Sequence, residues 1–302
     1  MREVQWERMF PDELERAFGE CPVAYFAYGM CEPHGPQNAL GLDALKAHGI
    51  ACRAAREHGG IVAPPDFWHV HDIAGCALWG MDAVGEVERK WLTAVPPWVH
   101  FRSVCYHIRA AEALHAHAAV FLTGHYGPNW KDLKTVLELA QPHVGTRLYG
   151  LPDFEANTPG FDGDGKSGGD HAGKVETSLM MAVDPACTDM TRLPTEEEAI
   201  ARGLHPWAMG RDAYRASLVT GERMVEDEVA FLGAKARELL AEYDRLKPEH
   251  RFTSFDAVER FWTSAVEPRV KDFAFMELDF SGKGRSVPER SVWHESWRAG
   301  RT

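Results

Sequence analysis

Short apolar runs alternate with amphipathic stretches along most of the chain. Four of these runs are bounded by glycine or proline and carry the β-branched and aromatic residues typical of buried strands. They span residues 21–30, 61–68, 118–127 and 146–154. The first run ends in Gly29 and the third in a glycine turn, so we expect these strands to end in loops.

The stretches between these runs have the periodicity of amphipathic helices. They cover residues 5–19, 42–60, 103–118, 132–143, 175–185 and 226–246. Alternation of strand and helix predicts an α/β fold of three layers, with a mostly parallel sheet flanked by helices. We expect residues 1–245 to form this domain. Residues 246–302 would then form a helical, tryptophan-containing extension, packed on the domain or at a subunit interface.

Composition narrows the functional classes. The net charge of −12 argues against a nucleic-acid or anionic-membrane surface. The six cysteines form no CxxC pair, which favours a reduced, cytosolic protein and argues against a structural zinc site. The charged first residues lack a signal-peptide core, and no run approaches the length of a membrane helix. We therefore expect a cytoplasmic location and a small-molecule substrate, with no nucleic acid or membrane as partner.

Polar clusters follow three of the predicted elements at points where the chain turns. Ligands of an open parallel sheet bind outside the carboxyl ends of its strands, so we expect these clusters to meet at one edge. Their mixed carboxylate and imidazole groups suit zinc, manganese or iron(II). The clusters are Glu32, His34 and Asp43; His125 and Tyr126; and Asp170, His171 and Glu176.

The first cluster lies in a segment that cannot form a regular helix. Pro33, Gly35, Pro36 and Gly41 shape residues 30–43 into a loop. Two interpretations remain open at this point: a polar surface loop, or a loop that holds a metal ion. A carboxylate such as Asp43 has two oxygens and can bridge two ions.

Three motifs in this order resemble the creatininase (creatinine amidohydrolase) family. "GMCEPHGPQNALGLD" is similar to the family's first signature, Gly-x-x-Glu-x-His-Gly-Pro followed by an aspartate. "TGHYG" is similar to its Asn-Gly-His-Gly-Gly-Asn turn, and "DHAGKVETSLMM" to its His-Ala-Gly-x-x-Glu-Thr-Ser helix start. The resemblance covers residues of about 20 to 240 and implies the family's three-layer α/β fold.

The resemblance also implies a site with two divalent metal ions. The family's ligands correspond to Glu32, His34, Asp43 and His125, with Asp43 as the bridge. Creatininase itself has a further ligand glutamate where this chain has Gly127. Water or Glu176 would complete the second ion's shell, although Glu176 at a helix start equally suits capping of backbone N–H groups.

The remaining site residues are expected to act on the substrate. His171 matches the family's catalytic histidine and would carry a proton to the leaving group, with Glu176 assisting. Tyr126 matches a residue that lines the family's substrate pocket. The substrate contacts that we expect are Tyr126, Trp68, His69, His71 and Asp170, although the tryptophan and histidines equally suit a subunit interface.

The reaction that the resemblance implies is metal-assisted hydrolysis of a small cyclic amide or formamide. Cleavage of a carbon–carbon bond in a cyclic diketone derived from an inositol, such as a dehydro-inosose, is an alternative, and an inactive metal- or ligand-binding homologue is a second. A doubly wound oxidoreductase is disfavoured because "GMCEPHG" does not match GxGxxG. The family resemblance further implies a homo-oligomer, a hexamer or smaller.

Overall fold

The computed structural model describes residues 2–71, 92–126, 129–157, 171–198 and 206–274 of the chain. A four-stranded sheet with the strand order β2-β1-β3-β4 lies at its centre. The strands are β1 (Val23–Tyr28), β2 (Ile61–Val62), β3 (Ala118–Thr123) and β4 (Arg147–Pro152). All neighbouring strands pair in parallel, and β1 and β3 match along six residues, from Val23 opposite Ala118 to Tyr28 opposite Thr123.

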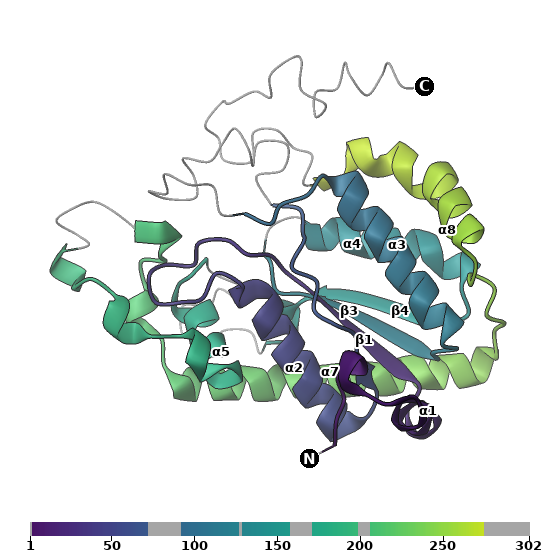
Figure 1. Cartoon of the computed structure of the whole chain (residues 1–302), viewed down its shortest axis with the longest axis horizontal. Helices are drawn as coiled ribbons and strands as arrows, with labels where there is room; N and C mark the ends of the chain where they lie inside the picture. Colours follow the sequence, from purple (N-terminus) through teal and green to yellow (C-terminus); the bar gives the residue numbers. More distant parts are fainter. Residues whose placement is uncertain (1, 72–91, 127–128, 158–170, 199–205, 275–302) are drawn as a thin grey trace.

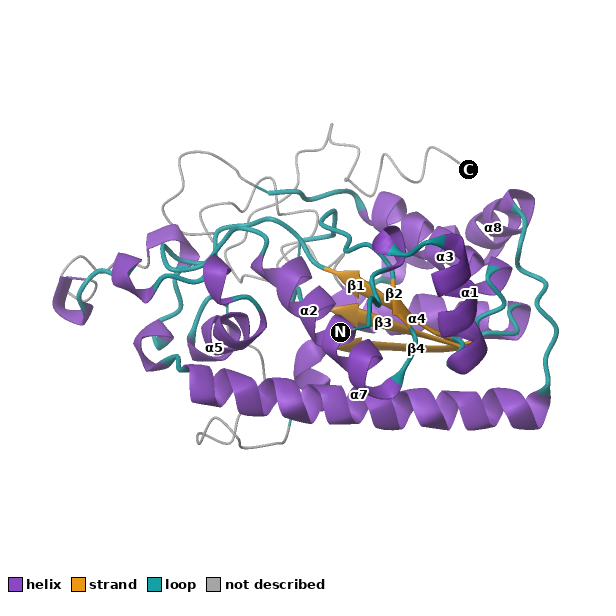
Figure 2. Cartoon of the chain, turned by 60° about the horizontal axis from the view of Figure 1, so that its bottom comes forward, coloured by secondary structure: helices purple, strands orange, loops and turns teal. Residues whose placement is uncertain are grey.

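Helices cover both faces of this sheet, which gives the three layers visible in Figures 1 and 2. The helices α2 and α7 cover one face, with α5 packed against both of them. The helices α3 and α4 cover the other face, with α8 packed on α3. The described helices are α1 (Pro11–Glu20), α2 (Leu42–His58), α3 (Pro97–Ala113), α4 (Asn129–Ala140), α5 (Lys174–Val183), α7 (Leu218–Leu246) and α8 (Phe255–Phe261).

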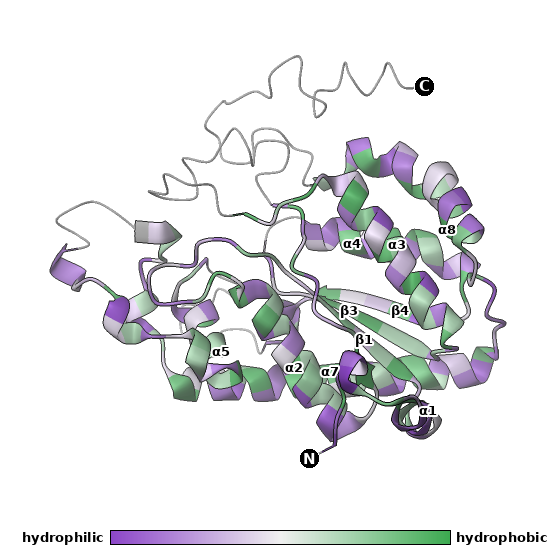
Figure 3. Ribbon diagram, in the orientation of Figure 1, coloured by the Kyte–Doolittle hydropathy of each residue, from purple (hydrophilic) through white to green (hydrophobic). Residues whose placement is uncertain are grey.

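Alternation of side chains along the strands supplies both hydrophobic cores. In β1, Tyr25 and Ala27 face α2 and α7, whereas Phe26 and Tyr28 face α3. Every residue of β1 and β3 is buried, and these strands are predominantly apolar, as Figure 3 shows. Continuous apolar strands are typical of parallel sheets with helices on both faces. The predicted fold class is confirmed.

Proline explains most of the shifted boundaries. The predicted helix over 5–19 is a 3-10 turn, Trp6–Arg8, followed by α1, which begins at Pro11. The third helix begins earlier than predicted, at Pro97. Proline is favoured in the first turn of a helix, where its missing N–H needs no partner. Pro64 and Pro65 limit β2 to two residues.

The described part of the C-terminal extension packs on α3 and α4. After α8 the chain continues as a π-helical turn, Trp262–Val266, and a 3-10 helix, Glu267–Asp272. Trp262 is 2% exposed and belongs to the same apolar cluster as the side chains of α3. Trp293 and Trp297 lie outside the described residues. Among the described helices, none combines the length and apolarity needed to cross a bilayer.

A buried carboxylate on α3 ties this extension to the sheet. Glu112 is fully buried. Its Oε1 accepts hydrogen bonds from the backbone N–H of Thr146, at 2.6 Å, and from Nδ1 of His250, at 3.0 Å. Its Oε2 accepts from the backbone N–H groups of Arg251, at 3.0 Å, and Phe252, at 3.3 Å.

We expect Glu112→Ala to lower the free energy of unfolding by about 3 kcal/mol, because several buried donors lose their acceptor together. Chemical denaturation measures this loss. Glu138→Ala, an exposed substitution on α4, is the matched control and should change stability by less than about 0.5 kcal/mol. An equal effect of the two substitutions would contradict this role of Glu112.

His100, in the first turn of α3, is buried beside another imidazole. Its ring centroid lies 4.0 Å from that of His69 and 5.5 Å from that of Tyr28. Its Nδ1 lies 3.2 Å from the carbonyl oxygen of Trp68. Burial, together with His69, holds the pKa of His100 well below its usual value. This histidine is therefore neutral in the folded protein at neutral pH.

The folded protein should lose stability as the pH falls below about 6.5, because His100 then gains a proton only in the unfolded chain. We expect the free energy of unfolding of the wild type to drop by about 1 kcal/mol more than that of His100→Gln between pH 7.5 and 5.5. Denaturation of both proteins without added metal measures the difference. Parallel losses in the two proteins would show that His100 does not contribute.

Candidate metal centre

The predicted ligands come from four segments that meet at the carboxyl edge of the sheet. Glu32 and His34 lie on the loop after β1, and Asp43 is in the first turn of α2. His125 follows β3, and Glu176 is in the first turn of α5. All five side chains are at least 97% buried. The convergence expected from strand ends in a parallel sheet is therefore present.

Two glycines allow Asp43 to reach this edge. A Cβ atom on Gly29, directly after β1, would lie 2.2 Å from the backbone nitrogen of Ala44. A Cβ atom on Gly124, directly after β3, would lie 2.1 Å from the carbonyl oxygen of Asp43. Since no other residue fits at these distances, the two glycines let the first turn of α2 pack against the strand ends. The positive end of the helix dipole also favours the Asp43 carboxylate.

Candidate ligand atoms form three groups close enough to hold an ion, and two of these groups share Asp43. The third consists of Glu32, His34 and the exposed His171. Atoms of Glu32, Asp43 and His125 lie within 4.8 Å of one another, and so do atoms of His34, Asp43 and Glu176. Asp43 Oδ2 is 3.1 Å from His125 Nδ1, and Asp43 Oδ1 is 3.0 Å from His34 Nε2. One carboxylate therefore presents a different oxygen to each of the two groups that share it.

These residues fit divalent ions. Glu32 Oε1, His34 Nε2 and Asp43 Oδ1 are buried, and none of them makes a hydrogen bond of good geometry within the described structure. Buried polar atoms are almost always satisfied, and mixed carboxylate and imidazole groups bind zinc, manganese or iron. Bound ions would satisfy all three atoms.

Protons compete with ions for this centre. Burial alone would raise the pKa of Asp43, but His34 and His125 lower it to about 2. Burial would lower the pKa of His34, but Asp43 and Glu176 raise it to about 9. A cation must displace these imidazole protons, so ion binding releases protons and becomes weaker in acid.

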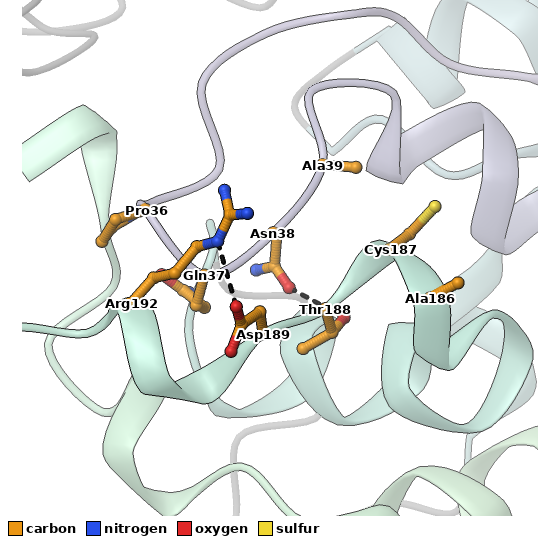
Figure 4. Close-up of a pocket in the computed structure, with 9 residues that line it drawn as sticks. All are labelled: Pro36, Gln37, Asn38, Ala39, Ala186, Cys187, Thr188, Asp189 and Arg192. Carbon is orange, nitrogen blue, oxygen red and sulfur yellow. Dashed lines mark hydrogen bonds and ion pairs between the residues drawn. The ribbon is translucent and has the colours of Figure 1, made fainter.

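Contacts with residues 186–192 hold the loop of Glu32 and His34 from outside. The backbone N–H of Ala39 donates to the carbonyl of Cys187, at 2.9 Å, and Thr188 Oγ1 donates to Asn38 Oδ1, at 3.2 Å. Figure 4 shows this contact region, whose residues line a small open pocket of about 160 Å³. Gly35 adopts a φ of 71° where the loop turns. These contacts hold the loop that carries the candidate ligands.

The motif around His171 contributes in two ways. His171 is exposed, its Nε2 lies 2.9 Å from the carbonyl oxygen of Pro33, and its ring stacks on that of His34 with 4.6 Å between centroids. Glu176 Oε2 accepts a hydrogen bond from the backbone N–H of Ala172, at 2.7 Å. Glu176 thus accepts a hydrogen bond from a backbone N–H, which was one of its two expected roles. It also belongs to the candidate ligand group of His34 and Asp43. Its catalytic role stays a prediction.

The predicted substrate contacts occupy different positions. His71 is buried, and its Nε2 is 2.9 Å from Glu32 Oε2, so it supports a candidate ligand. His69 is also buried, and burial lowers its pKa to about 3. Trp68 is 59% exposed. Asp170 lies outside the described residues, as does Gly127. The substrate roles of these residues stay predictions.

The structure adds a buried charge network that the sequence reasoning missed. Lys46, on α2, is fully buried, and its Nζ is 2.7 Å from Glu176 Oε1 and 3.3 Å from Asp153 Oδ2. It also lies 3.8 Å from the ring centroid of Tyr126. Burial would lower the pKa of Lys46, but Asp153 and Glu176 raise it. Glu228, on α7, is buried near Asp153, and burial raises its pKa well above the usual value.

A signal for this network was present in the sequence. Lys46 follows Asp43 by three residues and precedes Ile50 by four, which places it on the buried face of a helix. Glu228 is likewise on the apolar face of its helix, between Val225 and Leu232. Charged residues on buried helix faces are rarely found without a partner.

Comparisons with known proteins give one family. Residues 98–236 match the family model described as creatininase, creatinine amidohydrolase. A solved structure of creatinine amidohydrolase (creatininase) is 20% identical, with a TM-score of 0.60, and the match covers 79% of this chain and 99% of that chain. One described as creatininase Mn is 20% identical, with a TM-score of 0.58, over 78% of this chain and 98% of that chain.

A putative creatinine amidohydrolase from Bacteroides fragilis NCTC 9343 is 18% identical, with a TM-score of 0.59. That match covers 80% of this chain and 97% of the other. No curated protein matches the chain. At these identities the solved structures show the shared fold. A further similar structure is described as a Zn-Zn type, so forms with manganese and with zinc exist among the structural neighbours.

We expect His71→Phe to weaken ion binding at the group of Glu32, Asp43 and His125 by about 10- to 100-fold, because Glu32 loses its outer hydrogen bond. Titration against a chromophoric chelator measures the affinity. His69→Phe is the control. The ring centroid of His69 lies 5.4 Å from that of His125, and among the described residues the ring nitrogens of His69 contact the Val70 carbonyl and the Thr123 hydroxyl, neither of which is a carboxylate. Equal losses in both variants would attribute the effect to packing.

Proposed function

We propose that this chain is a member of the creatininase family and a metal-dependent hydrolase that cleaves the C–N bond of a small cyclic amide or a formamide. The observation that carries the proposal is the pair of ligand groups that share Asp43. Groups joined by one carboxylate can hold two ions close enough to act on a single substrate.

The ligand residues would each have a defined task. Glu32, Asp43 and His125 would hold one ion, and His34, Asp43 and Glu176 the other. Divalent ions in such positions lower the pKa of a bound water and polarise a carbonyl group. Deep burial of the ligands fixes their geometry, and His71 orients Glu32 through its 2.9 Å contact. Fixed ligands lower the cost of reorganisation during the reaction.

His171 is the proposed proton carrier. It is exposed at the rim of the centre, and its ring stacks on that of His34. Water gives a proton to the imidazole as its oxygen attacks the carbonyl carbon, and the departing nitrogen takes that proton when the C–N bond breaks. The contact between Nε2 and the Pro33 carbonyl, at 2.9 Å, holds the ring in place before the substrate arrives. A positioned acid of this kind contributes about 10²- to 10⁴-fold to a rate.

The experiment is a substrate panel assayed with the purified protein after loading with Mn²⁺ or Zn²⁺. The panel contains creatinine and other cyclic amides, formamides, and cyclic diketones derived from inositols. We expect turnover of one amide or formamide, with a loss of about 10²-fold or more in His171→Gln. Elemental analysis should give near-normal metal content in His171→Gln and a severe loss in Asp43→Ala.

The other outcomes separate the alternatives. Turnover of a diketone alone would assign carbon–carbon cleavage to the same centre. Full metal loading without turnover of any substrate would favour a binding homologue. Unchanged hydrolysis in Asp43→Ala would rule out the shared-carboxylate centre. The homo-oligomer stays a proposal, and sedimentation of the same sample tests it.

A further inference from the structure

Glu176 has different partners on its two carboxylate oxygens. Oε2 accepts a hydrogen bond from the Ala172 N–H, at 2.7 Å, and lies 3.7 Å from His34 Nε2. Oε1 lies 2.7 Å from Lys46 Nζ. The same carboxylate therefore belongs to a ligand group and to an ion pair with a buried ammonium. An ion bound with His34 and Asp43 has to share Glu176 with a fixed positive charge.

Lys46 cannot swing away from this position. Its side chain is fully buried, and its ammonium lies 3.3 Å from Asp153 Oδ2 and 3.8 Å from the centroid of the Tyr126 ring. Its stem packs on Gly124, where an added Cβ would be 3.1 Å from Lys46 Cε. With packing on one side and a carboxylate on another, the charge stays beside Glu176.

The other ligand group has a different neighbour. Glu32 is supported by His71, through the 2.9 Å contact between Nε2 and Oε2. An imidazole supports a carboxylate ligand as a neutral donor once an ion is bound, whereas the Lys46 ammonium keeps its charge. Repulsion between like charges in a buried site is weakly screened. The two groups therefore differ in electrostatic environment although they share Asp43.

We propose that Lys46 makes the two ion positions unequal, because its ammonium weakens binding of a divalent ion by His34, Asp43 and Glu176. The group of Glu32, Asp43 and His125 is then the tighter position. This inference rests on the proposed function, in that it takes the two groups as ion sites. It assigns to Lys46 control of the second ion's affinity, with no direct contact to substrate.

The test is a titration of metal-free protein with Mn²⁺, followed by calorimetry and by elemental analysis after gel filtration. We expect two steps in the wild type, the second at least about tenfold weaker than the first. Lys46→Gln keeps a hydrogen-bond donor for Glu176 but removes the charge. It should tighten the second step by about tenfold, the usual scale for residues that support metal ligands. His34→Gln identifies that step by removing it.

Control variants distinguish the effect of the Lys46 charge from its effect on the position of Glu176. Lys46→Arg keeps the charge and should leave the second step weak. Lys131→Gln removes an exposed lysine and should change neither step. If Lys46 served only to position Glu176, Lys46→Met would weaken the second step and Lys46→Gln would preserve it. That pattern, or an unchanged second step in Lys46→Gln, overturns the proposal.

If substitution of Lys46 prevents folding, the proposal can still be tested with a variant that retains Lys46. Asp153→Asn removes the countercharge, so the proposal expects the second step to weaken by several-fold while the first holds. A second step that tightens or does not change in Asp153→Asn contradicts the proposal. Circular dichroism and thermal unfolding of each variant identify the folded samples.

The titration contains no substrate, so it distinguishes this inference from the proposed function. Absence of any ion binding in the wild type overturns both. Two steps with an unaltered second step in Lys46→Gln overturn this inference alone. If the binding steps are as expected but no substrate in the panel is hydrolysed, the role of Lys46 is supported and the proposed reaction is ruled out.

Discussion

The close approach of α2 to the ends of β1 and β3 is the constraint on which the centre depends. Gly29 and Gly124 leave no side chain between the strands and the first helical turn, and a Cβ atom at either position would overlap the backbone around Asp43. The approach carries Asp43 between His34 and His125 and places Lys46 one turn further along the same helix. One packing contact thus positions both the shared ligand and the nearby cation.

The layers of the fold explain how so many charges can be buried at this edge. Two apolar clusters cover the faces of the sheet, and hydrophobic burial there stabilises the domain. The polar groups gather where the strands end, so their desolvation is offset by mutual pairing. Lys46 lies between Asp153 and Glu176, and His71 faces Glu32. Each of these contacts compensates a charge that would otherwise be costly inside a protein.

The chain keeps the creatininase fold at about one residue in five identical to the solved structures. The described part of the C-terminal extension packs on this domain, since Trp262 and Phe261 lie in the cluster formed by α3 and α4. Glu112 reinforces the connection by accepting hydrogen bonds from Arg251 and Phe252. The described part of this extension therefore contributes to the core of the same chain.

The sequence by itself determined the order of the elements and the candidate ligands. Apolar runs and helical periodicity are local properties, so they predicted β1, β3 and the C-terminal end of α7 closely, although α7 begins eight residues before the predicted start. Both α1 and α3 begin at a proline, because a proline in the first helical turn lacks only an N–H that would have no partner there. Glu32, His34 and Asp43 were recognisable because the residues around them form a motif.

Only the tertiary structure decided what surrounds those ligands. Lys46, Asp153 and Glu228 come from distant segments, and His71 follows a short strand, so no local pattern brings them together. The partner of a buried charge is set by packing across the sheet, which joins residues more than a hundred positions apart. The sequence thus determines which groups are available, and the packing of α2, α5 and α7 against the sheet decides which charges face one another.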